Sequence, residues 1–344
     1  MRFVDGLLEQ RSRCPRSGWL LGCALSLVAC QQQSSEPAPA TSISAAAAGA
    51  PELASAAPSA STGAAQDAGS LDAGAAKPAP PSAPDPKRYA WLGNETLKQP
   101  PAVTTLSQRF PPPPSYTRLP VEAGSFGEWL RDLPLAAPGT PVLNYKGEQV
   151  QAGSDQYLGA VVAMDTSELQ TSTDLVIRLN AEWKYSQGTD VVFKSATGID
   201  LPFARWLLGD RLKANGAAVN WIRNAKPAER SHAALRAYLE GVFTWANSTS
   251  LIASASPVAP SDIRPGDFLI HSGKPNHAVV LLDIARNPKG KLVALLGRAL
   301  SPAQSFHVLG LGLGETWYNI DPHSESLLTP GTASFPWSSA RRLR

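Results

Sequence analysis

Two of the five histidines stand at a spacing that could support metal chemistry. His271 and His277 flank a five-residue segment with the composition of a hairpin loop. Residues that face each other across two antiparallel strands have Cβ atoms about 5 Å apart, so two imidazoles could share a metal ion there. A third ligand would have to come from His307, His323 or Asp283, and no spacing marks any of them. A metal site is therefore an alternative, and ordinary histidines at a hairpin end are the simpler interpretation.

Asp174 and Glu182 could act as a general acid and base, but Arg178 lies midway between them. The spacing of four residues puts all three side chains on one face of a helix, where ion pairs explain them more simply. The sequence contains no Gly-x-Ser-x-Gly, no His-Glu-x-x-His and no P-loop motif. It therefore indicates no cofactor.

The N-terminal segment has the pattern of a secretion signal. Several arginines precede an apolar run over residues 19–29, which is shorter than the roughly 20 residues of a transmembrane helix. The run ends Leu27-Val28-Ala29-Cys30, which is similar to the lipobox of bacterial lipoproteins. The similarity implies that residues 1–29 are a signal peptide and that Cys30 is acylated, palmitate being a usual acyl group. An uncleaved membrane anchor is the alternative.

The residue after Cys30 bears on where such a lipoprotein would be sorted. It is Gln31 rather than an Asp of the inner-membrane retention signal, which favours the outer membrane. All three cysteines lie within the first thirty residues. A mature chain that begins at Cys30 would have no other thiol, which excludes a cysteine nucleophile or a cysteine zinc site from the folded part.

Residues 30–88 are expected to form a disordered linker between the lipid and a folded domain. Over residues 36–86, 35 of 51 residues are Ala, Pro or Ser. Such a segment cannot bury enough apolar surface to offset its ordering entropy. The net charge of the whole chain is +3 and no Lys/Arg-rich run occurs, so we expect no nucleic-acid partner.

Residues 89–344 contain eight of the nine tryptophans and should form a single globular domain. Capping residues, apolar spacing and end signals predict helices at residues 126–130, 167–188, 203–213 and 229–245. The period then changes to that of strands, which are expected at 267–271, 277–284, 292–297 and 306–309. Helices followed by an antiparallel meander indicate an α+β fold.

Several motifs of this domain resemble those of a bacterial family, the domain of unknown function 4846. The matching segments are residues 125–135, 169–183, 265–280, 301–309, 316–318 and 329–330. The resemblance covers about 118–337. Members of this family are commonly secreted or lipid-anchored, which agrees with the leader, and the family has no assigned activity to carry over.

A fainter resemblance is to papain-like cell-wall amidases of the NlpC type. In those enzymes a cysteine at a helix start attacks an amide, and a histidine at the head of a strand acts as the base. The resemblance places Ser172 at the nucleophile position, where the related family typically has Cys, and His277 at the base position. The third, orienting group would come from the next strand, which reads Gly297-Arg298 and offers none. Since a hydroxyl is far less acidic than a thiol, the resemblance implies weak or lost activity.

Three functional hypotheses follow from the sequence. The first is an outer-membrane lipoprotein with a non-catalytic or degenerate papain-like domain that binds the cell wall (peptidoglycan) or a partner protein of the envelope. The second is a hydrolase of amide or ester bonds that uses Ser172 and His277. The third is a metal site at His271 and His277. The absence of a thiol favours the first.

Overall fold

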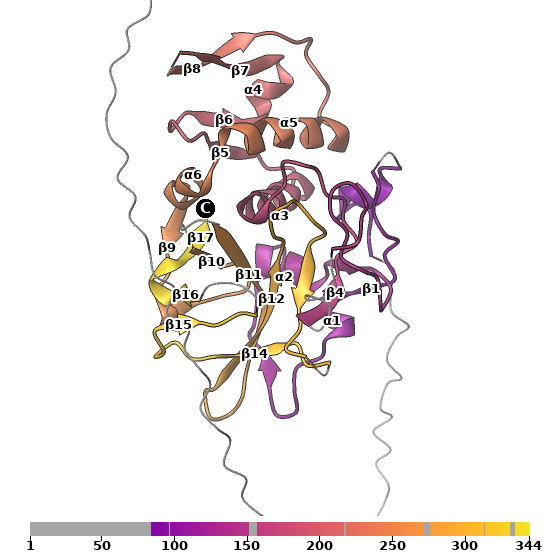
Figure 1. Ribbon diagram of the computed structural model, residues 1–344, viewed down its shortest axis with the longest axis vertical. Coiled ribbons are helices and arrows are strands. Elements are labelled where there is room, and N and C mark those ends of the chain that lie inside the picture. Colours follow the sequence, from indigo (N-terminus) through magenta and orange to yellow (C-terminus); the bar gives the residue numbers. More distant parts are fainter. Residues whose placement is uncertain are drawn as a thin grey trace, which may run out of the picture. The chain divides into compact units, whose positions relative to one another are not determined.

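The computed structural model describes residues 84–95, 97–150, 157–216, 218–271, 276–312, 314–330 and 334–344 (Figure 1). These residues belong to one compact unit, Gly74–Arg344. The predicted signal peptide (1–29), Cys30 and the predicted linker up to residue 83 lie outside the described residues. No helix within the described ranges is long and apolar enough to cross a membrane.

The domain is built on an antiparallel sheet that has nine strands within the described residues. Its path runs in the order β4 (Leu158–Val161), β13 (His307–Leu309), β12 (Leu292–Arg298), β11 (His277–Arg286), β10 (Phe268–His271), β17 (Ala340–Leu343) and β9 (Ala255–Pro257). β14 (Trp317–Ile320) pairs with β12, and β2 (Thr117–Arg118) pairs with β11. The predicted meander of four strands is thus confirmed as β10 to β13, and so is the α+β class.

The longer helices lie on one side of this sheet (Figure 1). They are α3 (Ser172–Ser186) and α5 (His232–Trp245). The shorter helices are α1 (Leu106–Arg109), α2 (Phe126–Arg131), α4 (Phe203–Leu207) and α6 (Ser248–Ala253). Two-stranded pairings complete the fold, namely β1 (Thr104–Thr105) with β3 (Pro134–Leu135), β5 (Val192–Lys194) with β6 (Asp200–Pro202), β7 (Asp210–Asn215) with β8 (Ala218–Arg223), and β15 (Ser326–Leu327) with β16 (Phe335–Pro336).

The sheet separates two apolar clusters. On the helical side, Val280 of β11 packs in one cluster with Leu175 and Leu179 of α3. On the other side, Leu281 packs with Tyr318 and with residues of the C-terminal segments. Because both faces are covered, β11 is apolar almost throughout, as strands buried on both faces usually are.

The predicted start of α3 was wrong by four residues. The sequence suggested a cap at Ser167 with Gln170, but the helix begins at Ser172, after the N-cap Thr171. The Thr171 side chain and backbone N–H both bond the Asp174 carboxylate, at 2.7 and 3.2 Å. This capping box satisfies the first turn in place of the upstream pair. The predicted helix end near Gly188 is confirmed, with the C-cap at Gln187.

The predicted helix over 203–213 was also too long. α4 ends at Leu207, and the chain turns at Gly209 into the β7–β8 hairpin. Gly209 has a φ of +94°, and a Cβ there would lie 2.1 Å from the carbonyl oxygen of Ala225. Only glycine fits this turn, and the turn breaks a pattern that otherwise suits a helix.

Candidate functional site

Ser172 is the first residue of α3, which packs against β11. Its side chain is buried, with 1% of the residue exposed. The hydroxyl oxygen accepts a hydrogen bond of 3.0 Å from the backbone N–H of Ala278. The helix start is thereby attached to the second residue of β11, directly beside His277.

The imidazole of His277 lies on the opposite face of the sheet from α3. Ala278 and Val280 belong to the cluster that contains α3, whereas Val279 and Leu281 belong to the cluster on the other face. Successive side chains of a strand point to opposite faces, so His277 lies on the face of Val279. The structure therefore brings the backbones of Ser172 and His277 together but not their side chains.

Other basic groups surround the half-buried His277. His271 pairs with it across the β10–β11 hairpin, as the sequence predicted. Burial lowers the pKa of His277, and the neighbouring His271 and Arg298 lower it further. Its Nδ1 atom is buried and has no hydrogen-bond partner among the described residues. The ring thus lacks the acceptor that would orient a catalytic base.

Strand β12, which pairs with β11, carries the cation that acts on His277. Arg298 is 4% exposed and donates through Nη1 to the carbonyl of Pro330 at 2.6 Å. Its strand partner His307 is buried, and burial lowers the pKa of this imidazole to about 4. Asp283 is occupied elsewhere, because its two carboxylate oxygens accept from Arg118 and Arg131. Within the described part of the chain, no group of three or more His, Cys, Asp or Glu could hold a metal ion.

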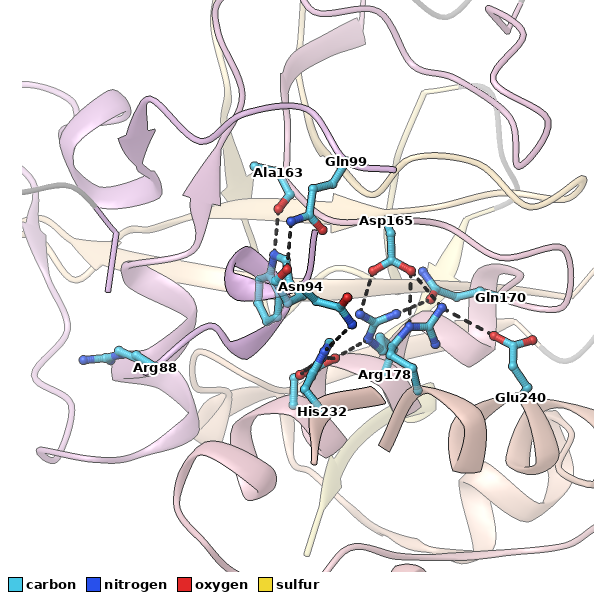
Figure 2. A network of polar contacts seen from close by, with 12 residues as sticks. Arg88, Asn94, Gln99, Ala163, Asp165, Gln170, Arg178, His232 and Glu240 are labelled. Atoms are coloured by element: carbon cyan, nitrogen blue, oxygen red, sulfur yellow. Dashed lines mark hydrogen bonds and ion pairs between the residues drawn. The ribbon is translucent and has the colours of Figure 1, made fainter. Parts of the chain in front are cut away.

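A network of buried charges connects α3 to α5 (Figure 2). Its centre is Arg178, which has no exposed side-chain surface. The guanidinium donates to Asp165 at 2.9 Å, to Glu182 at 2.6 Å and to Gln170 at 3.0 Å. Asp165 and Gln170 come from the connection between β4 and α3, so this one arginine holds that connection against the helix.

Helix α5 completes the network with two side chains. Arg236 donates to Asp165 through Nη2 at 2.8 Å. The Nε2 atom of His232 lies 2.9 Å from a Glu182 oxygen. Since a carboxylate only accepts, Nε2 carries the proton of this contact. Asp165 and Glu182 are thus each shared by two basic side chains, one from α3 and one from α5.

Electrostatics keeps both of these carboxylates ionised. Burial alone would raise the pKa of Asp165, but Arg178 and Arg236 together outweigh burial and lower it. Burial likewise opposes ionisation of Glu182, and Arg178 with His232 lowers its pKa. Asp174 differs, because burial raises its pKa to about 6. A paired, ionised network of this kind fixes the positions of helices and has no free group for proton transfer.

The sequence predicted one ion pair of this network and none of the others. The predicted pairing of Arg178 with Glu182 is confirmed, while Asp174 bonds Thr171 instead. Asp165 and Arg236 had no signal in the sequence, because they lie 71 residues apart. Only the presence of charged residues on a helix that must pack against a sheet could have suggested buried partners.

The comparisons place this α+β domain in a family. The family model described as "Domain of unknown function (4846)" matches residues 106–342, and the chain belongs to this family. The match extends somewhat beyond the resemblance read over 118–337. Neither a curated protein nor a solved structure matches the chain.

Proposed function

We propose that this protein is a lipoprotein of the outer membrane, anchored through Cys30, whose α+β domain binds the cell wall or a partner protein of the envelope without catalysis. The lipobox-like segment before Cys30 and the Ala/Pro/Ser-rich segment after it support the anchoring. A segment of that length and composition would hold the domain away from the lipid surface. Cys30 would link the protein to the membrane, and no nucleic acid is expected as a partner.

The environment of Ser172 is the observation that supports a non-catalytic domain best. A serine nucleophile needs a base within hydrogen-bond reach and a path for the substrate. Ser172 is 1% exposed, and its oxygen accepts from the Ala278 N–H. The imidazole of His277 lies across the sheet and stands beside the cationic Arg298. This arrangement suits a structural hydroxyl and opposes the alternative, a Ser172/His277 hydrolase.

Co-sedimentation of the full lipidated protein, purified in detergent, tests the binding function. The protein is incubated separately with purified peptidoglycan and with a detergent extract of outer-membrane proteins. The proposal predicts that it pellets with peptidoglycan or forms a stoichiometric cross-linked complex with one envelope protein. His277→Ala should do the same. If the protein binds neither peptidoglycan nor an envelope protein, the proposal is contradicted.

A further inference from the structure

A cavity of about 420 Å³ lies between strand β14 and the segment that contains Pro111 and Pro113. Three aromatic side chains line it, namely Phe110, Tyr116 and Trp317. Sites for small organic ligands have volumes of roughly 300–1,000 Å³ and walls that are mainly apolar or aromatic. The cavity therefore has the size and the lining of a small-molecule site.

Strand β14 contributes an aromatic ring and an amide to the same wall. Trp317 and Asn319 both line the cavity and are two residues apart, so their side chains point to the same face of the strand. Tyr318 between them packs in the apolar cluster on the other face. The indole Nε1 of Trp317 donates to the carbonyl of Pro111 at 2.9 Å, which fixes the ring against the proline segment.

A turn of the proline segment holds Tyr116 at the cavity. The backbone N–H of Tyr116 donates to the carbonyl of Pro113 at 3.0 Å. Ser115 within this turn has a φ of +68°, and no other non-glycine residue among those the structure describes has a positive φ. Such backbone conformations cost energy and are concentrated at ligand sites. The turn thus positions the Tyr116 ring in advance of a ligand.

The polar side chains of the wall are within reach of a ligand. Glu315 and Asn319 are exposed, and their side chains have no hydrogen-bond or ion-pair partner within the described ranges. Arg109 is half-buried and donates through Nη2 to the carbonyl of Ala136 at 2.9 Å. Arg109 and Glu315 are the charged residues among the described ones that line the cavity, and their charges are opposite. This balance favours a neutral ligand.

Aromatic rings beside groups that donate and accept hydrogen bonds match the chemistry of a saccharide. A pyranose packs its apolar C–H face on an aromatic side chain, while its hydroxyls can donate to Glu315 and accept from the Asn319 amide. Aromatic grooves also take proline-rich peptides. Proline has no N–H to donate to the carboxylate of Glu315, so the free carboxylate favours the saccharide.

We propose that this cavity binds a neutral saccharide, with a sugar ring on Tyr116 and Trp317 and hydroxyls on Glu315 and Asn319. The inference rests on the proposed binding function and deepens it by naming the ligand class, since the cell wall contains glycan strands. Both the N-acetylated amino sugars of the wall and envelope glycans of plain hexoses present this chemistry.

Calorimetric titration of the full lipidated protein, in a detergent without a sugar headgroup, tests the assignment. The probes are tetra-N-acetylchitotetraose, cellotetraose and decaproline. We expect at least one oligosaccharide to bind and decaproline not to bind. Stronger binding of the N-acetylated probe would identify the wall glycan, and stronger binding of cellotetraose would identify hexose glycans. If neither oligosaccharide binds, or if decaproline binds more tightly than both, the assignment is overturned.

Variants of the exposed wall locate the binding. Asn319→Ala and Tyr116→Ala should each weaken binding about fivefold, which corresponds to a loss of about 1 kcal/mol. The matched controls are Asn220→Ala, at an exposed asparagine of β8, and Tyr145→Ala, at a half-buried tyrosine, because neither residue lines this cavity. Both controls should bind as the wild-type protein does. Unchanged binding by both cavity variants would overturn the assignment.

The titration with soluble saccharides does not depend on sedimentation with the wall. A protein that pellets with peptidoglycan but binds neither oligosaccharide would rule out the cavity and leave the proposed function in place. Failure of the cavity and failure of the proposed function are therefore distinguishable.

Discussion

The hydroxyl of Ser172 accepts a hydrogen bond of 3.0 Å from the backbone N–H of Ala278. The bond joins the start of α3 to the start of β11 across 106 residues of sequence. In the papain-like arrangement the corresponding helix start would present a nucleophile to the histidine of that strand. Here the serine oxygen is used by the neighbouring backbone instead, and the imidazole of His277 points to the other face of the sheet.

Ser172→Ala should therefore destabilise the domain. The substitution leaves the Ala278 N–H buried without an acceptor, and we expect a loss of about 1–3 kcal/mol in the free energy of unfolding. Ser186→Ala, at the last residue of the same helix, is the matched control. Ser186 is half-buried and donates only to the carbonyl of Trp183 within its own helix, so its loss should cost under about 1 kcal/mol. Urea unfolding of both variants measures the two losses. Equal unfolding midpoints for Ser172→Ala and Ser186→Ala would contradict the structural role of Ser172.

Arg178→Met should be among the most destabilising changes in the domain. It leaves the buried carboxylates of Asp165 and Glu182 with one basic partner each, and breaking a buried pair in this way costs about 3–5 kcal/mol. Arg205→Met is the control, because the Arg205 side chain is 46% exposed in its pair with Asp210. An exposed pair contributes about 0–1 kcal/mol. If both variants unfold at the same urea concentration, the network does not stabilise the helices.

His307 should make the domain less stable in mild acid. Its pKa in the folded state is about 4, lowered by burial from an ordinary 6.5. The unfolded chain therefore takes up a proton below pH 6.5 while the folded chain does not, and stability falls as the pH falls from 6.5 towards 4. The full effect is on the order of 3 kcal/mol. His307→Gln should reduce this loss, as measured by urea unfolding at pH 7 and pH 5.

Asp174 should make the domain more stable as the pH falls, over much of the pH range in which His307 makes it less stable. Its folded pKa is about 6, raised by burial from 3.8, so the folded chain takes up the proton first and stability rises as the pH falls from 6 towards 4. Asp174→Asn removes this contribution and should make the acid loss steeper than in the wild-type protein. If neither this variant nor His307→Gln changes the difference between pH 7 and pH 5, the two buried groups do not titrate as described.

Cys30 should carry the lipid. Cys30→Ala should abolish incorporation of labelled palmitate in cells and shift the protein out of the outer-membrane fraction, because the acyl chains provide the anchoring. Cys23→Ala changes a cysteine of the same apolar run and should leave both readouts unchanged. Retention of label by the Cys30 variant would contradict the lipoprotein assignment.

The sequence predicted the sheet better than the helices. Strands β10 to β13 follow turn residues and apolar runs that are local, so their order and pairing could be predicted. The start of α3 depended on a competition between two capping patterns four residues apart. The helix begins after Thr171, whose capping box is completed by Asp174. The end of α4 depended on a close approach between Gly209 and Ala225, which no local pattern reveals.

The candidate site was less predictable, for two reasons. The resemblance predicted that Ser172 lies next to the start of β11. The face of the sheet to which His277 points depends on the strand register, because a shift of one residue moves a side chain to the opposite face. The network around Arg178 draws on Asp165, His232 and Arg236, which come from three places along the chain. Helix periodicity alone shows only the pair within α3.

Replacement of Ser172 by cysteine, the nucleophile of the papain-like amidases that the sequence faintly resembles, tests the non-catalytic account most directly. Wild-type protein, Ser172→Cys and Ser172→Cys/His277→Ala are incubated with purified peptidoglycan, and the bound protein and the soluble wall fragments are both measured. The account predicts equal binding or equal non-binding by all three and no release of fragments, because the position is buried and the imidazole lies across the sheet. Release of fragments by wild-type protein or by Ser172→Cys, lost in the double variant, would contradict it.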